Sequence, residues 1–248
     1  MNEILLFNKK ELYEVEHNSR GRSYKWEKIP QRTKNKKIYD NMHLVDGMEF
    51  TTSGTPIMKP YNGSTDFTCI PYTQRNKFDG SGMALHFFLN DYQFRNPVWN
   101  NLENTTYQIK SYDFLFTPDL SLWKDYPTDF YNYQNIFRTR FIGAYWQLKG
   151  FNVIPTASWG GLNSFKYCFD GLPNNSVIAV SGMGNQKDSQ SYNLWCYGIR
   201  RLEEDKKPNL ILVYGQEIEI EGLKTPIQFI PDFITTNLRK IKKHGSKS

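Results

Sequence analysis

Short apolar runs alternate with helical patterns through the middle of the chain. Two long segments have apolar side chains at steps of three and four, which is the spacing of one helix face. Buried strands that alternate with helices are typical of a parallel sheet, with helices packed over its faces. The pattern therefore predicts an α/β fold. The runs with the length of a buried strand are residues 84–91, 112–122, 151–159, 175–182 and 209–215.

The two helical segments also have start and stop signals. Asp125 can cap the first helix, Pro127 suits its first turn, and Gly150 suits the position just past its end. The second helix is expected at residues 189–207, opened by Asp188. The apolar stripe of the first helix is Phe130, Tyr133, Phe137, Phe141, Ala144, Tyr145 and Leu148.

Outside these elements the pattern is weaker. Residues 97–110 could form a helix, although their many Asn and Thr residues make it a poor one. Apolar and charged residues alternate at 217–221, as in an edge strand or hairpin arm. The apolar residues of 226–235 show no clear periodicity. Residues 47–82 are rich in Gly, Pro and Thr, which predicts loops with a short strand. A closed eight-unit barrel needs about 250 residues of strand–helix repeats. We therefore expect a mostly parallel sheet with flanking helices, either open or like a truncated barrel, with a loop-rich N-terminal part.

Charge separates the two ends of the chain from its body. The net charge of +6 consists of +4 in residues 1–40, +5 in residues 236–248 and −3 between them. We therefore divide the chain into a basic N-terminal arm (1–46), an α/β domain (47–235) and a basic C-terminal tail (236–248). Basic ends can neutralise phosphates, or they can simply keep a protein soluble.

The N-terminal arm also contains aromatic residues among its basic ones. Tyr24 and Trp26 lie in a stretch with eight basic residues and one acid. Aromatic rings can stack on bases while cations meet phosphates; alternatively, Trp26 docks on the body. The candidate nucleic-acid contacts are Arg20, Arg22, Lys25, Trp26, Arg239, Lys240, Lys242 and Lys243.

Several function classes find no support in the sequence. The three cysteines are far apart and the four histidines are scattered, so neither a disulfide framework nor a metal site is expected. No apolar run of about 18 residues and no secretory signal occurs, which predicts a cytoplasmic protein without a membrane partner. His86 lies inside a predicted strand, where a core histidine is expected. GxSxG is absent, and no motif specifies a cofactor.

Ligands of parallel α/β folds bind beyond the carboxyl ends of the strands. This rule places Asp91 and Asp119 at one rim, where they could act as general acid and base or hold a divalent cation. Alternatively, each caps a helix or turn. The other rim residues expected to bind a ligand are Ser158, Trp159, Ser181, Gly182, Gly184 and Asn185.

The segment 181–185 joins a strand to a helix start, so its backbone N–H groups could hold an anion. A tight turn explains the same glycines. On the first helix, Arg138 and Arg140 lie about 200° apart, so only one of them can face the sheet. That arginine could orient a ligand or form a buried pair that stabilises the fold.

One run of residues carries a resemblance to a known family. The pattern D-x-P…N-x-x-R-x-R-x-x-G-x-Y-W-Q comprises Asp125, Pro127, Asn135, Arg138, Arg140, Gly143, Tyr145, Trp146 and Gln147. With the strand sequences around it, this pattern resembles a domain-of-unknown-function family found in phages and in mobile elements of Gram-positive bacteria. Where that family has two acids, this chain has Asn90-Asp91, which weakens a mechanism that needs both. The resemblance implies no established reaction.

Three functional hypotheses follow from these patterns. The first is a phage or mobile-element protein that engages nucleic acid through its basic ends, in replication or maintenance of the element. The second is an enzyme acting on a phosphorylated or sugar-like ligand, such as a nucleotide, at the strand-end rim, with Asp91, Asp119 and one of the two arginines as catalytic residues. The third is a protein-binding module that interferes with a host factor, for which an exposed aromatic patch in place of a polar pocket would be diagnostic.

Overall fold

The computed structural model describes residues 39–183, 188–218 and 220–233. The chain divides into two compact units, Met1–His43 and Leu44–Ser248. The 3-10 turn η2 (Tyr39–Leu44) holds the described residues of the first unit. Everything below concerns the second unit. The predicted nucleic-acid contacts in both basic ends lie outside the described residues.

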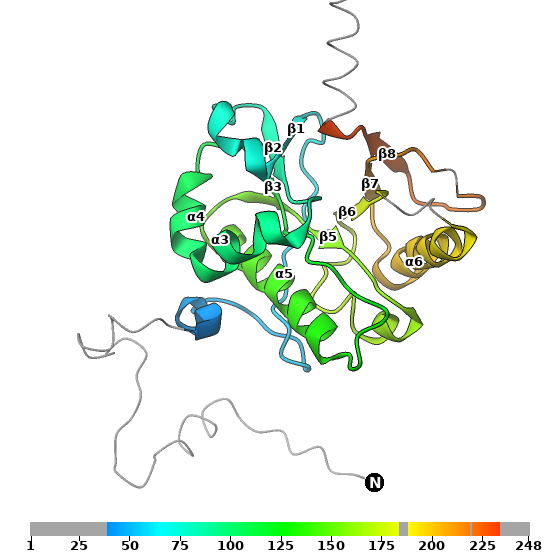
Figure 1. The fold of residues 1–248 in the computed structure, drawn as a ribbon. Helices are drawn as coiled ribbons and strands as arrows, with labels where there is room; N and C mark the ends of the chain where they lie inside the picture. Colours follow the sequence, from blue (N-terminus) through cyan, green and yellow to red (C-terminus); the bar gives the residue numbers. More distant parts are fainter. Residues whose placement is uncertain (1–38, 184–187, 219, 234–248) are drawn as a thin grey trace, which may run out of the picture. The chain divides into compact units, whose positions relative to one another are not determined.

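Eight short strands in the described residues form two four-stranded sheets, in which every pairing between strands is parallel. The order in the sheets is β1-β2-β3-β4 and β5-β6-β7-β8, the same as the order along the chain (Figure 1). The prediction of a parallel α/β fold is confirmed. The strands are β1 (Thr68–Pro71), β2 (Met83–His86), β3 (Phe114–Phe116), β4 (Asn152–Ile154), β5 (Thr156–Ala157), β6 (Val177–Ser181), β7 (Leu210–Tyr214) and β8 (Ile227–Ile230).

The two sheets meet at Pro155. β4 pairs with β3 and β5 pairs with β6, yet β4 and β5 are separated by this one proline. Proline has no N–H to donate to a ladder, but its carbonyl accepts a hydrogen bond from the N–H of Ala179 at 2.8 Å. The predicted strand at 151–159 is therefore one run of chain that passes from the first sheet to the second.

The sheets curve around a shared interior, as in a truncated barrel. Thr65, in the segment before β1, and Gln228 of β8 are joined by two hydrogen bonds of 2.8 and 3.2 Å. His86 at the end of β2 lies 4.3 Å from the ring of Tyr214 at the end of β7, centroid to centroid. The buried residues of this interior are Tyr61, Ala84, Phe116, Ile154, Val177, Ala179, Leu212, Tyr214 and Ile230.

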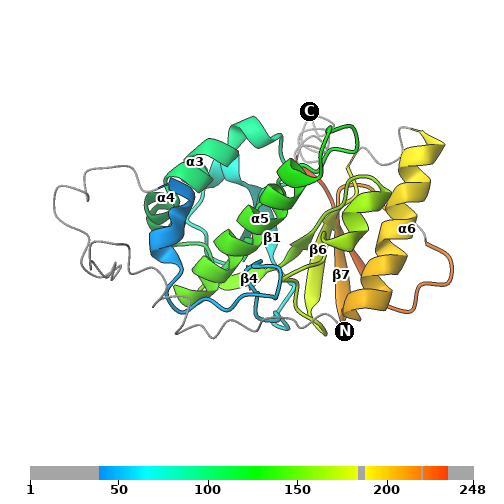
Figure 2. The same ribbon diagram turned by 90° about the horizontal axis from the view of Figure 1, so that it is seen from below.

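Helices cover the outside of the sheets, with α5 beside β4 and α6 beside β7 (Figure 2). The outward side chains of β6 and β7 pack in one cluster with Ile136 of α5 and with Trp195 and Ile199 of α6. The α-helices are α3 (Arg95–Asn100), α4 (Leu102–Gln108), α5 (Phe130–Leu148) and α6 (Ser189–Lys206). The remaining 3-10 turns are η3 (Tyr72–Lys77), η4 (Asp91–Gln93) and η5 (Leu162–Lys166).

The helix ends confirm some sequence signals and correct others. Asp188 caps α6 by accepting from the N–H of Ser191 at 2.7 Å, as predicted. Gly150 follows α5 with a φ of 86°, also as predicted. The predicted start of α5 was wrong: the helix begins at Phe130, with Asp129 in place of Asp125 at the N-cap position, and the Thr128 hydroxyl accepts from the N–H of Phe130 at 3.0 Å.

Other boundaries also differ. The expected helix at 97–110 is two short helices that meet at Asn101. Residues 217–221 were expected to form an edge strand, but the structure has none in their described part, and the last strand is β8 instead. The strands are shorter than their apolar runs, since loops at the carboxyl rim are buried as well.

Candidate functional site

A pocket of about 300 Å³ opens at the carboxyl rim of the strands. It lies past the ends of β3, β5 and β6, and Trp195 of α6 forms part of its wall. Four of the rim residues singled out from the sequence line it, namely Asp119, Ser158, Trp159 and Ser181. The other lining residues are Ser121, Leu122, Trp123, Ala157, Val180, Met183 and Trp195.

Asp119 is the titratable group of this pocket. Burial raises the pKa of its carboxyl group from 3.8 to about 7, and the negative charge of Asp91 adds to this effect. A hydrogen bond to the Ser158 side chain and the positive charge of Arg140 act in the opposite direction. Asp119 can therefore exchange a proton near neutral pH, which an ordinary aspartate cannot do.

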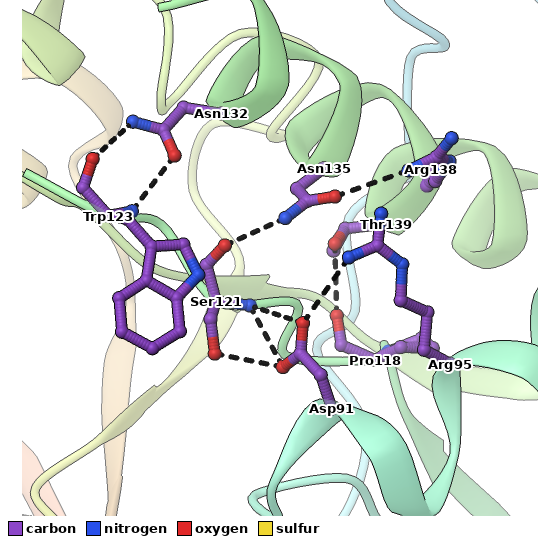
Figure 3. Close-up of polar contacts among 9 residues, drawn as sticks. All are labelled: Asp91, Arg95, Pro118, Ser121, Trp123, Asn132, Asn135, Arg138 and Thr139. Atoms are coloured by element: carbon purple, nitrogen blue, oxygen red, sulfur yellow. Dashed lines mark hydrogen bonds and ion pairs between the residues drawn. The ribbon is translucent and has the colours of Figure 1, made fainter. Parts of the chain in front are cut away.

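Asp91 lies at the same rim and is joined to the pocket through Ser121. Its carboxylate accepts from the Ser121 hydroxyl at 2.8 Å and from the Ser121 N–H at 3.2 Å (Figure 3). The Arg95 guanidinium lies 3.9 Å away. These bonds cross to the loop after β3, so the side chain does not cap its own helix. Asp91 is thus held between Ser121 on one side and Arg95 on the other.

A row of polar side chains on α5 holds the loop that carries Asp119. Asn135 donates to the carbonyl of Ser121 at 2.7 Å, and Thr139 donates to the carbonyl of Pro118 at 3.0 Å (Figure 3). Asn132 bonds both backbone groups of Trp123, at 2.9 and 2.8 Å. Spacings of three and four place these side chains on one helix face.

The sequence interpretation missed Asn132, Thr139 and Trp123. The signal for the first two was present: polar residues at positions 132, 135 and 139 repeat with helical spacing. All three polar side chains of this row are buried. A buried polar stripe on a helix indicates a partner with free backbone groups.

The two arginines of α5 have different surroundings. Arg140 is fully buried and donates to three backbone carbonyls, those of Thr156, Cys168 and Asp170, at 2.8–3.0 Å. Burial lowers the pKa of its guanidinium from 12.5 to about 10. Arg138 is partly exposed, donates to Asn135 at 3.4 Å and lies over the Trp99 ring. Arg140 thus fixes the chain around β5 and does not line the pocket.

Of the segment 181–185 at the end of β6, which the sequence suggested as an anion site, the structure describes residues 181–183. The N–H of Gly182 donates to the carbonyl of Tyr214 at 2.8 Å, and a Cβ at Gly182 would lie 3.0 Å from Val213. Gly182 therefore makes a tight turn and does not line the pocket. Gly184 and Asn185 lie outside the described residues. Among the described residues that line the pocket, Asp119 is the one ionisable side chain.

His86 is a core residue, as predicted. It is fully buried, stacks on Phe88 and lies close to Tyr214. Burial lowers the pKa of its imidazole to about 3, so it stays neutral at physiological pH. Across the described ranges, no three His, Cys, Asp or Glu side chains gather as metal ligands would. In the same ranges, no helix has the length and apolar character needed to cross a membrane.

These features define a parallel, barrel-like α/β protein with an acidic, tryptophan-walled pocket at its carboxyl rim. The chain belongs to a family described as a domain of unknown function (DUF4417), whose model matches residues 52–231. The family resemblance inferred from the α5 motif is thereby confirmed.

Two phage proteins are similar to the chain. Each is a Gene 1 protein, one from Mycobacterium phage L5 and one from Mycobacterium phage D29, and each is 40% identical over 146 residues. The alignment covers 59% of this chain, and 63% and 53% of the two phage proteins, so the chain spans less than two thirds of either relative. No solved structure matches the chain. These findings support a phage protein; a role in mobile elements and binding to DNA stay predictions.

The family motif has a structural explanation. Asn135 and Arg140 bond backbone carbonyls, as described above. A Cβ at Gly143 would lie 2.5–2.7 Å from the side chains of Met58 and Thr117. Glycine at this position therefore lets α5 pack directly against these two side chains. Trp146 is buried and donates to the Thr106 hydroxyl at 2.9 Å. The motif therefore maintains the framework of the site.

Proposed function

We propose that the chain is an enzyme that performs acid–base chemistry on a sugar-like ring at the carboxyl rim. The observation that carries this proposal is the pair of carboxyl groups. Asp119 has a pKa near neutrality, and the neighbouring Asp91 is held by a hydroxyl, an N–H and an arginine. Two carboxyl groups in different environments can divide the roles of acid and base.

The pocket lining favours a neutral ring over a phosphate. The rings of Trp123, Trp159 and Trp195 form part of the lining, and the serines supply hydroxyl donors and acceptors. A phosphate would lie beside the Asp119 carboxyl group, and none of the described lining residues is a cation that could neutralise it. Of the ligands considered from the sequence, a sugar or the sugar-bearing part of a nucleoside fits better than a phosphorylated group.

The test is turnover with a panel of p-nitrophenyl glycosides and nucleosides, followed as release of nitrophenol or free base. We expect turnover with at least one substrate, a pH profile that inflects near 7, and a loss of about 100-fold or more in kcat for Asp119→Asn. Asp66→Asn is the control, because Asp66 is an exposed carboxylate just before β1, at the opposite end of the strands. Equal rates for both variants, or no turnover by the wild type, would overturn the proposal.

A second candidate function is nucleic-acid binding through the basic ends. It is supported by charges of +4 and +5 at the ends against −3 in the body. A mobility-shift series in increasing salt tests it: affinity should fall steeply, with a slope of about −0.9 for each neutralised phosphate. Replacing Arg239, Lys240, Lys242 and Lys243 by Gln should flatten that slope. No binding at low salt would end this idea.

A further inference from the structure

An exposed group of aromatic side chains adjoins the pocket. Trp123, Tyr126, Phe130 and Tyr131, here called the aromatic platform, are 52%, 41%, 60% and 53% exposed. Successive rings lie close together, with centroids 6.0 Å apart for Trp123 and Tyr126 and 5.7 Å apart for Tyr126 and Tyr131. Contiguous exposed aromatic surface of this kind marks a binding site.

The platform is continuous with the pocket and is held in place. Trp123 both lines the pocket and begins the platform. Its backbone N–H and carbonyl are both bonded to the buried Asn132 amide (Figure 3). Phe130 and Tyr131 are the first residues of α5, so the other end of the platform is anchored on a helix. Its rings are thus presented to solvent on a fixed backbone, which limits the entropy lost on binding.

The charge around the platform distinguishes between ligands that stack on aromatic rings. Residues 123–131 contain one lysine and two aspartates, for a net charge of −1. At the adjoining rim lie the carboxyl groups of Asp119 and Asp91, the second of them beside the Arg95 guanidinium. A single-stranded nucleic acid also stacks on aromatic rings, but it needs a positively charged groove along its backbone. An uncharged chain of sugar rings has no phosphates, so the negative charge around the platform does not oppose its binding.

We propose that the pocket and the aromatic platform together bind a linear, uncharged oligosaccharide. One sugar ring occupies the pocket beside Asp119, and the following rings pack their C–H faces against single rings of the platform, in which Trp123 and Tyr126 are inclined by 31° and Tyr126 and Tyr131 by 72°. The inference rests on the proposed function, since it names the substrate class of the same site. It adds that the substrate is a polymer, recognised beyond the reacting ring.

The test compares single sugars with their hexamers. The probes are glucose, N-acetylglucosamine and xylose, their β-1,4-linked hexamers, and a ten-nucleotide oligothymidylate, with binding followed by tryptophan fluorescence and calorimetry. We expect at least one hexamer to bind ten-fold or more tightly than its monomer. The double variant Tyr126→Ala/Tyr131→Ala should lose this gain and keep the affinity for the monomer. Tyr107→Ala is the control, because Tyr107 is 67% exposed on α4 and is not a platform residue.

The outcomes separate the two proposals. Equal affinities for monomer and hexamer, or a double variant with an undiminished hexamer gain, overturn the oligosaccharide inference and leave the acid–base site standing. Tighter binding of the oligothymidylate that depends on Tyr126 and Tyr131 also overturns it, in favour of nucleic acid. Failure to bind any of these sugars also overturns the oligosaccharide inference, whereas the acid–base site is judged separately by the turnover panel of glycosides and nucleosides. Because the substituted side chains are exposed, circular dichroism should show unchanged folding.

Discussion

The carboxyl group of Asp119 should make the stability of the fold depend on pH. Its pKa is 3.8 in an ordinary aspartate and about 7 in the folded protein, so between these values the folded protein holds a proton that the unfolded chain has lost. By linkage, the free energy of unfolding falls as the pH rises from about 4 to about 7. At 1.36 kcal/mol for each pKa unit, the largest loss is about 4 kcal/mol. Since the side chain is partly exposed in the pocket, we expect about 2–3 kcal/mol.

Asp119→Asn removes this titration and keeps the size of the side chain. The variant should therefore be more stable than the wild type at pH 8, by about 2–3 kcal/mol, and equally stable at pH 4. The assay is urea unfolding followed by circular dichroism at steps from pH 4 to pH 8. The same variant should lose turnover, because a group that costs stability at neutral pH is retained for its chemistry.

A matched control separates this effect from the general titration of carboxylates. Asp66→Asn changes an exposed aspartate and should shift the stability by less than about 0.5 kcal/mol at every pH. If Asp119→Asn is less stable than the wild type at pH 8, or if the two curves run parallel, burial does not raise the pKa of Asp119 and the argument for an acid–base role fails.

Three further predictions concern the framework of the pocket. Arg140→Met removes the donor from two buried carbonyls and from the partly buried carbonyl of Asp170, so the free energy of unfolding should fall by about 3 kcal/mol or more in urea titration; a loss below about 1 kcal/mol would contradict the role of Arg140 in fixing the chain around β5. Asn132→Ala removes both bonds to the Trp123 backbone and should cost about 1–3 kcal/mol, with faster hydrogen exchange at the Trp123 amide as the specific readout. Gly198→Ala places a Cβ 2.0 Å from the Trp159 ring, so it should destabilise by about 1–3 kcal/mol and shift the tryptophan fluorescence; an unchanged spectrum would contradict the close packing.

The alternation of strands and helices was readable from the sequence because it depends on local pattern. Apolar runs identified most of the strands. The Asp188 cap located the start of α6, and Gly150 located the end of α5. The rule for parallel folds then brought Asp119, Ser158 and Ser181 to one rim. Such features depend on residues close in sequence or on one general topological rule.

The rest depended on contacts between distant segments. The apolar stripe predicted for α5 includes Phe130 and Leu148, which are exposed, whereas Asn135 and Arg140 are buried. Helical periodicity suggests that polar residues face water. Here the two polar side chains are buried because they donate hydrogen bonds to backbone carbonyls of other segments. The sequence of β8 shows no regular alternation of apolar and polar residues. This strand is positioned by its pairing with β7, which local sequence does not reveal.

One helix reaches both sides of the pocket. Through Asn132, Asn135 and Thr139, α5 is fastened to the loop after β3, and through Arg140 it is fastened to the chain around β5. Two stretches of the pocket wall, the loop after β3 and the chain around β5, therefore share a single support. A cavity built in this way keeps its width, so it should select ligands by shape and tolerate little remodelling to admit a larger one.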